Sequence, residues 1–326
     1  MSIPLLSVRG LSMTFPIRAG VLQRTRGHVY AVSDVSFDLR RGGTLGIVGE
    51  SGSGKSTLGK CIIRLVEPTA GTVVFDGRDV THLREPELRR SIRSRIQMVF
   101  QDPFSSLNPR QSLQSIVEEP LHVHHRLERT QRTAYAADLI ERVGLDPARR
   151  DRKPHEFSGG QRQRIAIARA LALQPELIIA DEPVSALDVS VQAQIMNLLE
   201  DLQSELGLTY VFISHDLSVV RHASEDVAVM YLGRLMELAP RDSLFADYRH
   251  PYTQALMSAV PSVRRAGAQR RSRVVLSGEV PDSSDPPGGC VFHTRCPYAR
   301  DRCRTEVPAV RDIAENHRIA CHFPVE

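Results

Sequence analysis

Tryptophan is absent from this 326-residue sequence, and the aromatic residues together account for only 5% of it. No apolar run approaches the roughly 18–20 consecutive residues that a membrane-spanning helix requires, so the sequence predicts no transmembrane helix. The first residues, MSIPLLSVRG, lack the charged start and the long apolar core of a secretory signal. We therefore expect that the chain is not exported and that any role at a membrane depends on partners.

Excess charge is also small, because 42 basic and 38 acidic residues leave a net charge of +4. So modest a value does not favour nucleic acid as a partner. Basic residues are concentrated in one place, which we interpret as a solvated linker, with contact to anionic lipid headgroups as the alternative. This cluster consists of Arg264, Arg265, Arg270, Arg271 and Arg273.

Cysteine is scarce, and four of the five residues crowd into the C-terminal part of the chain. Their spacing is C-x5-C-x6-C-x17-C, at Cys290, Cys296, Cys303 and Cys321. In a chain that is not exported, such a cluster indicates a metal site rather than disulfides. The C-x2-C pair that is common in zinc sites is missing. Zinc, an iron–sulfur cluster and free or disulfide-bonded thiols all remain open from spacing alone.

Short apolar runs rich in β-branched residues alternate with helix-like segments, which is typical of an α/β fold with a largely parallel core sheet. The predicted strands are Thr44–Gly49, Thr72–Phe75, Arg95–Phe100, Leu177–Ala180 and Thr209–Ile213. The predicted helices are Lys55–Val66, Ser158–Leu173 and Val189–Leu206. Residues 102–157 are polar and helical in pattern, so we expect a helical insertion between core segments 1–101 and 158–240. Proline, glycine and cysteine accumulate in 241–326, which indicates a small C-terminal extension.

A phosphate-binding loop follows the first buried strand, because GESGSGKS at 49–56 fits the pattern G-x-x-x-x-G-K-[ST]. Its glycines allow backbone N–H groups to turn inward around phosphate oxygens, and the helix that begins there adds a partial positive charge. Lys55 is expected to contact the β- and γ-phosphates, and Ser56 to ligate Mg²⁺. The predicted nucleotide-binding residues here are Gly49, Ser51, Gly52, Gly54, Lys55, Ser56 and Thr57.

Two adjacent carboxylates end a later buried strand, LIIADE at 177–182. Asp181 is placed at the strand end to hold Mg²⁺ through water, and Glu182 to polarise an attacking water as a general base. An acidic turn that caps the next helix would explain one carboxylate, but not easily both beside a phosphate loop.

The segment FSGGQ at 157–161 resembles the LSGGQ signature of ABC-type ATPases, with Phe157 in place of the first leucine. Ser158, Gly159, Gly160 and Gln161 stand where a helix begins, so their hydroxyl and amide groups can meet an anion. The resemblance implies that this signature faces the phosphate loop of a second subunit, with two ATP molecules held between the subunits of a head-to-tail dimer. It also implies a P-loop NTPase core with an N-terminal antiparallel β region, the helical insertion and the cysteine-containing extension.

Other landmarks of the family occur in order along the chain. Gln101 resembles the glutamine that contacts Mg²⁺ and the attacking water, and His215 resembles the histidine that contacts the γ-phosphate. Asp188, in SALD, resembles the aspartate of the loop that crosses the dimer interface. Phe15 resembles the aromatic residue that stacks on adenine, with Tyr30 as the alternative.

Three further segments resemble ATP-binding subunits of oligopeptide/dipeptide importers: QDPFSSLNP at 101–109, HPYTQAL at 250–256 and GGCVFHTRCPYA at 288–299. This resemblance implies an ATPase on the cytoplasmic face of the plasma membrane. It implies two permease subunits, a second and different ATPase chain and, indirectly, a solute-binding protein as partners. By the same resemblance the four cysteines hold a [4Fe–4S] cluster rather than zinc. The competing interpretation is an ABC ATPase that acts on nucleic acid or ribosomes. The single cassette and the small net charge do not favour it.

Overall fold

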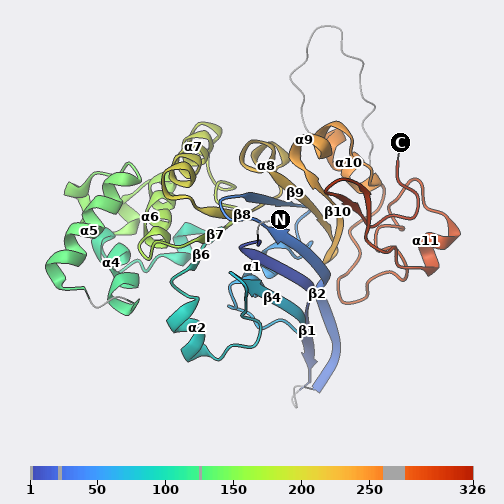
Figure 1. The fold of residues 1–326 in the computed structure, drawn as a ribbon, viewed down its shortest axis with the longest axis horizontal. Coiled ribbons are helices and arrows are strands. Elements are labelled where there is room, and N and C mark those ends of the chain that lie inside the picture. Colours follow the sequence, from blue (N-terminus) through green and yellow to red (C-terminus); the bar gives the residue numbers. More distant parts are fainter. Residues whose placement is uncertain (1–2, 21–23, 125–126, 260–275, 326) are drawn as a thin grey trace, which may run out of the picture.

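The computed structural model describes residues 3–20, 24–124, 127–259 and 276–325 (Figure 1). The arginine cluster of residues 264–273 lies outside these described residues. Within them, no helix is both long enough and apolar enough to cross a membrane.

The core is an eight-stranded sheet with the order β11-β12-β10-β9-β3-β8-β7-β6. The five strands from β9 to β6 are parallel, while β10, β12 and β11 continue the sheet in antiparallel fashion. The alternating strands and helices of the sequence therefore predicted the parallel part correctly. In chain order the strands are β3 Thr44–Val48, β6 Ile96–Val99, β7 Leu177–Asp181, β8 Thr209–Ser214, β9 Asp226–Tyr231, β10 Arg234–Pro240, β11 Arg311–Ala314 and β12 His317–Ile319.

A second sheet is entirely antiparallel, with the order β2-β1-β4-β5. Its long strands β1 (Leu6–Ala19) and β2 (Arg24–Leu39) form a ribbon that extends from the body of the molecule (Figure 1). Strands β4 (Ala70–Phe75) and β5 (Arg78–Asp79) complete it. The apolar run at 72–75 therefore belongs to this sheet and not to the parallel core, because its pairing partner is β1.

Some helices lie against the two sheets, and others form a separate group at one end of the molecule, in green in Figure 1. Helix α1 packs between the two sheets in one buried apolar cluster, and α4 to α7 share a second. In chain order the helices are α1 Lys55–Ile62, α2 Glu85–Ser91, α3 Pro103–Ser106, α4 Leu113–His124, α5 Arg129–Arg142, η1 Pro147–Arg149, η2 Pro154–Glu156, α6 Gly159–Leu171, α7 Val189–Leu206, α8 Leu217–Ala223, α9 Arg241–Ala246, α10 Pro251–Ala259 and α11 Asp301–Thr305.

The C-terminal extension is joined to the core by both its backbone and its side chains. Strand β12 pairs with β10, so the core sheet continues into the extension. A third buried cluster includes Tyr231 of β9, Tyr252 of α10 and Phe292, whose rings lie 4.8–5.2 Å apart between centroids. The extension therefore packs against β9 and β10, at one side of the core sheet. The phosphate loop follows β3, which is the neighbour of β9 in the same sheet.

Candidate functional site

The phosphate loop connects β3 to α1, as the sequence predicts. Lys55 is only 5% exposed, and its Nζ donates to the carbonyl oxygens of Gly49 (2.8 Å) and Glu50 (2.9 Å). Burial lowers the pKa of Lys55, and the charges of Glu182 and Asp181 oppose that shift. The ammonium group thus lies inside the loop, bonded to groups that a phosphate oxygen could replace.

Two glycines of the loop are required by close backbone contacts. A Cβ atom at Gly49 would lie 2.1 Å from the Met230 carbonyl oxygen, and one at Gly54 would lie 2.0 Å from that of Ala31. Gly54 also has a φ of 96° and caps α1 without a side-chain hydrogen bond. The first N–H groups of α1 therefore remain available to an anion.

A candidate magnesium site joins the loop to the end of β7. The Ser56 hydroxyl donates a 2.8 Å hydrogen bond to Asp181 Oδ1, and Asp181 is 3% exposed. Burial raises the pKa of Asp181, and the bond from Ser56 partly offsets the rise. Oxygen ligands of this kind suit Mg²⁺, which usually keeps several waters and binds through one or two protein groups plus phosphate. The two predicted ligands are therefore in contact.

Two other residues singled out in the sequence contact the Glu182 carboxylate, one at each oxygen. Gln101 Nε2 donates to Glu182 Oε2 at 2.8 Å, and His215 Nδ1 lies 3.1 Å from Glu182 Oε1. The Glu182 side chain is 13% exposed, whereas that of His215 is 55% exposed. The structure brings together three residues that the sequence separates widely. They place a carboxylate, an amide and an imidazole beside the phosphate loop.

The signature segment begins α6 and packs on the loop that contains Asp188. Ser158 Oγ accepts the Gln161 N–H at 3.3 Å, and Gln161 Oε1 accepts the Ser158 N–H at 3.0 Å. A Cβ atom at Gly160 would lie 2.4 Å from Val191 Cγ1, at the start of α7. Asp188 caps that helix by accepting the Val191 N–H at 2.9 Å. Among the described residues, no hydrogen bond joins the signature to the phosphate loop of the same chain.

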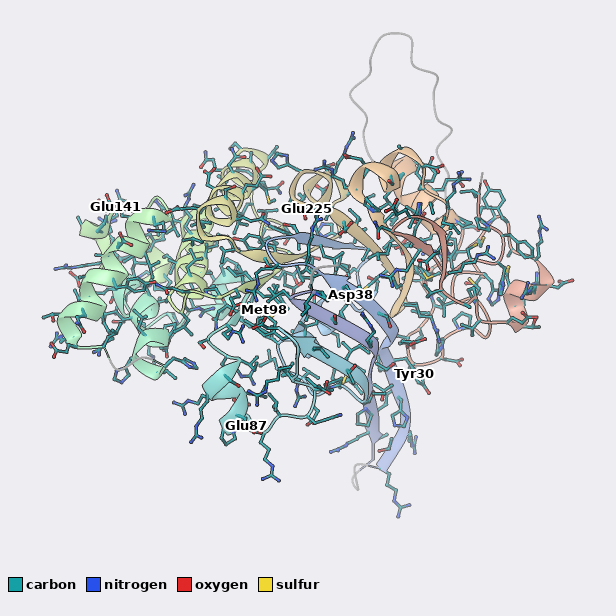
Figure 2. The ribbon with its side chains drawn as sticks, viewed as in Figure 1. Tyr30, Asp38, Glu87, Met98, Glu141 and Glu225 are labelled. Atoms are coloured by element: carbon teal, nitrogen blue, oxygen red, sulfur yellow. The ribbon has the colours of Figure 1, made fainter. Side chains whose placement is uncertain are left out.

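The two candidates for adenine stacking both lie on the β1–β2 ribbon. Phe15 is 38% exposed and Tyr30 41% exposed, so neither ring is a core residue. The strand register pairs Phe15 with Val29 and Tyr30 with Thr14, which directs the two rings to opposite faces of the ribbon. Tyr30 lies on β2, away from Glu141, which lies on α5 at one end of the molecule (Figure 2). The assignment to Phe15 stays a prediction.

Comparison with known proteins decides the family. Residues 32–185 match a family model for ABC transporters, and residues 236–303 match the oligopeptide/dipeptide transporter C-terminal region. The oligopeptide transport ATP-binding protein AppF of Bacillus subtilis is 57% identical over 98% of this chain and 97% of its own length. The chain belongs to the ATP-binding proteins of peptide ABC transporters. A "Probable peptide ABC transporter ATP-binding protein" of Sinorhizobium fredii is 55% identical over 99% of this chain and 90% of that protein.

Solved structures of ABC cassettes share the fold. A dimeric ATP-binding cassette in a post-hydrolysis state, bound to ADP and Pi, is 32% identical with a TM-score of 0.65. The match covers 72% of this chain and 98% of that one. A cassette of an ABC transporter complex from Clostridium perfringens is 29% identical, with a TM-score of 0.63, over 76% of this chain and 92% of its own. This ABC ATPase is therefore an ATP-hydrolysing enzyme, and its predicted fold class is confirmed.

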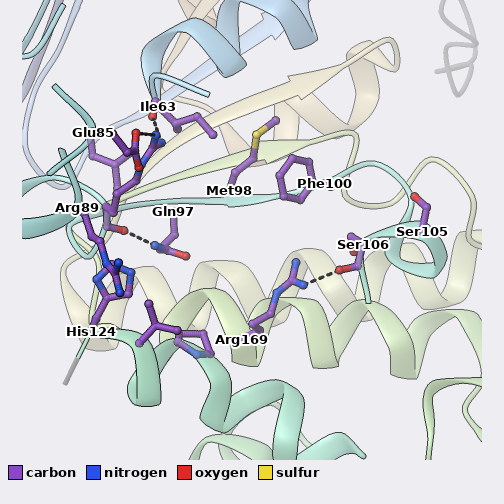
Figure 3. Close-up of a pocket in the computed structure, with 14 residues that line it drawn as sticks. Ile63, Glu85, Arg89, Gln97, Met98, Phe100, Ser105, Ser106, His124 and Arg169 are labelled. Carbon is purple, nitrogen blue, oxygen red and sulfur yellow. Dashed lines mark hydrogen bonds and ion pairs between the residues drawn. The ribbon is translucent and has the colours of Figure 1, made fainter. Parts of the chain in front are cut away.

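An open groove of about 730 Å³ lies beside the Gln101 segment of this ABC ATPase, between β6 and helices α4 and α6 (Figure 3). Arg169 of α6 donates to the Ser106 carbonyl at 2.6 Å, and burial lowers the pKa of its guanidinium. Arg93 donates to the Ile63 carbonyl at 2.7 Å and pairs with Glu85 at 3.0 Å. The titratable groups that line the groove are Glu85, Arg89, Arg93, His124 and Arg169, so basic groups predominate.

The four C-terminal cysteines line one small pocket of about 10 Å³, together with His293 and His322. Burial raises the pKa of Cys290, that of Cys296 to about 11 and that of Cys321 to about 12, so these thiols are neutral. In the part of the chain that the structure describes, no group of three or more His, Cys, Asp or Glu residues is arranged to hold a metal ion. The structure thus supports the convergence of the cysteines, but it does not support the expected [4Fe–4S] cluster or zinc.

Sequence reasoning missed the groups of the extension that contact the phosphate loop. Arg295 Nη1 pairs with Glu50 Oε2 at 2.8 Å, and the Glu50 N–H donates to Tyr252 Oη at 3.0 Å. Both contacting residues lie in segments that had marked the peptide-transporter type, HPYTQAL and GGCVFHTRCPYA. Those segments indicated the family, but nothing in them predicted a contact with Glu50, which lies about 200 residues or more away in the sequence.

Proposed function

We propose that this chain supplies the energy for peptide uptake by hydrolysing Mg-ATP at a site that is completed by a second ATPase subunit. The observation that carries the proposal is the contact of Glu182 with both Gln101 and His215, beside a phosphate loop whose Ser56 contacts Asp181. A general base, its orienting partners and the metal ligands are thereby assembled in one chain. Membership among peptide transporter ATPases supports peptides as the solute.

In the proposed reaction, Lys55 exchanges its bonds to the loop carbonyls for bonds to the β- and γ-phosphates. Mg²⁺, held by Ser56, Gln101 and, through water, Asp181, would neutralise charge on the phosphate oxygens. Glu182 accepts the proton of the attacking water, and the Gln101 amide orients that carboxylate. His215, the more exposed partner, is free to turn from Glu182 toward the γ-phosphate.

We propose that the signature of the second subunit completes each site in a head-to-tail dimer. The signature of this chain makes no hydrogen bond to its own phosphate loop among the described residues, and solved cassettes of this fold include dimers. Ser158, Gly159, Gly160 and Gln161 would then contact the nucleotide bound by the partner, and Asp188 would lie at the interface. We propose a different ATPase chain as the usual partner, as the resemblance of this chain to peptide importers implies.

The groove is proposed to receive a segment of a permease subunit. It lies between the ATPase core, proposed as residues 1–101 and 158–240, and the helical subdomain, proposed as 102–157. Its excess of basic groups favours a docking segment that carries a carboxylate. Arg89→Glu should reduce co-purification with the permeases while leaving the ATPase rate of the isolated chain unchanged. Equal recovery of permeases with both proteins would contradict docking at this groove.

These partners would place the chain at the cytoplasmic face of the plasma membrane as a peripheral subunit, because no described helix could span a bilayer. A solute-binding protein would deliver the peptide to the permeases without touching this chain.

We propose that the four cysteines form an iron–sulfur site in the C-terminal extension, proposed as residues 241–326. The support is the donor set, because the four thiols of the C-terminal extension line one pocket, and cysteine thiolates hold such clusters. Binding would require their deprotonation and an opening of the small pocket between them. Iron and sulfide should be measured in anaerobically purified protein, beside a Cys296→Ser variant. Protein without iron, sulfide or brown absorbance would contradict the cluster.

The test of the function is uptake of a labelled peptide by cells that lack this chain, complemented with the wild type or with Glu182→Gln. We expect uptake with the wild type alone, and equal uptake of a free amino acid by both. Uptake of labelled peptide by cells that carry Glu182→Gln would contradict the proposal.

The alternative of an ABC ATPase acting on nucleic acid or ribosomes is not supported, because the relatives that span the whole chain are named for peptide transport. Hydrolysis that rises on addition of RNA or DNA, and not with permeases, would revive it.

A further inference from the structure

The phosphate loop is held from outside by the C-terminal extension, through one residue of the loop. Arg295 is 9% exposed in its side chain and forms its ion pair with Glu50, at 2.8 Å. Its Nη1 also lies 3.4 Å from Tyr231 Oη, while its Nε is buried without a hydrogen-bond partner. Glu50 therefore supplies the compensating charge for a guanidinium that is nearly removed from water.

The backbone of the same loop residue is held by a second contact. The N–H of Glu50 donates to the hydroxyl of Tyr252, a fully buried side chain of α10. The ring of Tyr252 packs on Phe292, which precedes Arg295 by three residues and accepts the Arg295 N–H at its carbonyl oxygen. Arg295 and Tyr252 thus belong to one packed unit, and both contact Glu50.

The third polar group of Glu50 faces the nucleotide site. Its carbonyl oxygen accepts a 2.9 Å hydrogen bond from Lys55 Nζ, the group proposed to bind the phosphates. The extension therefore binds the side chain and the N–H of Glu50, and the carbonyl oxygen of Glu50 binds Lys55. We propose that Arg295 and Tyr252 are positioning residues that hold the phosphate loop in its ATP-binding conformation. The cysteine-bearing extension and the ATP site are then coupled through Glu50.

Coupling of this kind is reciprocal. If the extension favours the loop conformation that binds ATP, then ATP must stabilise the extension by the same free energy. Typical couplings change affinity by about 5- to 150-fold. If Arg295 and Tyr252 only stabilised the fold, their substitution would not specifically lower the affinity for ATP. Nor would ATP protect the extension from hydrogen exchange. The inference rests on the proposed ATP site, so that site is tested first.

The experiment measures the Kd for a fluorescent ATP analogue in the full chain, for the wild type, Arg295→Ala, Glu50→Gln and the double variant. Arg295→Lys and Tyr252→Phe test the same contacts with smaller changes, should Arg295→Ala fold poorly. Arg302→Ala is the control, because Arg302 forms an exposed pair with Glu306 in the same extension. Hydrogen exchange across residues 288–303, with and without the nucleotide, reports the reciprocal effect in each protein.

We expect Arg295→Ala and Glu50→Gln to raise the Kd by similar factors, on the order of 10-fold. The double variant should lose no more than either single variant, because both remove one contact. ATP should slow exchange in the extension of the wild type and of Arg302→Ala, but not of Arg295→Ala. Wild-type affinity in Arg295→Ala, or losses that add in the double variant, would overturn the coupling. Failure of the wild type to bind the nucleotide would overturn the ATP site itself.

Discussion

Gln101 donates a 2.8 Å hydrogen bond from its side-chain amide to the Glu182 carboxylate, across 81 residues of sequence. The amide donates through its nitrogen, so the hydrogen bond holds Oε2 of Glu182 in place. The other oxygen, Oε1, then lies beside His215. A carboxylate held in this way needs little rearrangement to accept a proton. The pair therefore connects the segment beside the groove to the proposed general base.

Glu182→Gln should lower kcat by about 10²- to 10⁴-fold, because an amide cannot accept the proton of the attacking water. ATP binding should persist, since Lys55 and Ser56 are unchanged. Steady-state ATPase assays and nucleotide titration check both parts. Glu205→Gln is the matched control, because Glu205 is an exposed residue of α7 that pairs with Arg142. A variant that keeps more than a tenth of the turnover would remove Glu182 from the role of general base.

Ser56→Ala should raise the Mg²⁺ concentration needed for half-maximal hydrolysis by roughly 10- to 100-fold, as is common when a metal site loses an orienting partner. The change removes both the proposed ligand and the hydrogen bond to Asp181. Chelation of Mg²⁺ should abolish hydrolysis in the wild type, and added Mg²⁺ should restore it. Ser91→Ala, at the C-terminal end of α2, should behave as the wild type. Equal Mg²⁺ dependence of Ser56→Ala and the wild type would exclude Ser56 as a ligand.

Features that depend on local sequence could be predicted well. Helix α7 has the predicted bounds Val189–Leu206, because Asp188 caps its start and Gly207, with a φ of 65°, ends it. Helix α1 begins at Lys55 as predicted, but it ends at Ile62 rather than Val66, since Arg64 takes a left-handed φ of 57°. The pattern of apolar residues does not reveal such a conformation. Cys61 of α1 is fully buried.

Pairings between distant segments could not be predicted. The run at 72–75 has the composition of a core strand, but only its contact with β1 shows that it belongs to the second sheet. The pairing of Glu237 in β10 with Ile319 in β12 is of the same kind. The contact between Glu50 and Arg295 spans 245 residues and involves two polar side chains that carry no periodic signal. The motifs therefore predicted the residues that the structure brings together at Glu182, but not the parts of the extension that contact the phosphate loop.

Gly160→Ala should disrupt the signature while leaving the phosphate loop intact. The new Cβ would lie 2.4 Å from Val191 Cγ1, and a β-branched side chain has few other rotamers, so α6 and α7 must separate. Overpacking of this size costs about 1–3 kcal/mol of stability. We expect normal ATP binding by the isolated chain but loss of the ATP-dependent dimer with the partner ATPase, measured by light scattering in the Glu182→Gln background.

Gly159→Ala provides the comparison, because its Cβ would meet the flexible end of Leu187 at 3.3 Å. We expect a smaller stability cost for this variant than for Gly160→Ala. An unchanged dimer in Gly160→Ala would show that packing of the signature on α7 is not needed for dimer formation.

Glu237 is fully buried in β10, where it joins the core sheet to the extension. Its carboxylate accepts hydrogen bonds from His317 Nε2 (2.8 Å) and from the N–H groups of Arg249 (2.6 Å) and His250 (3.0 Å). Burial alone would raise the pKa of Glu237, but the hydrogen bonds, led by that of His317, outweigh burial and lower it. Glu237→Gln should therefore reduce the stability of the fold at pH 7 by about 2–4 kcal/mol, because an amide presents N–H groups to these donors.

The pH dependence follows from the sign of that shift. A carboxylate whose pKa is lower in the folded than in the unfolded chain stabilises the fold above the unfolded value of about 4.3, and the contribution is lost as the pH falls through the folded value. His250, whose pKa burial lowers to about 4, also favours unfolding in acid, so the wild type alone cannot isolate Glu237. The charge of Glu237 also raises the pKa of His250, so the difference in melting temperature between the wild type and Glu237→Gln reports the carboxylate together with its effect on His250. We expect the difference to be constant from pH 7 to 5 and to shrink below about pH 4. Glu315→Gln, in the exposed turn between β11 and β12, is the control and should have the same melting temperature as the wild type at every pH. If the difference for Glu237→Gln does not shrink in acid, the charge of Glu237 does not contribute to stability.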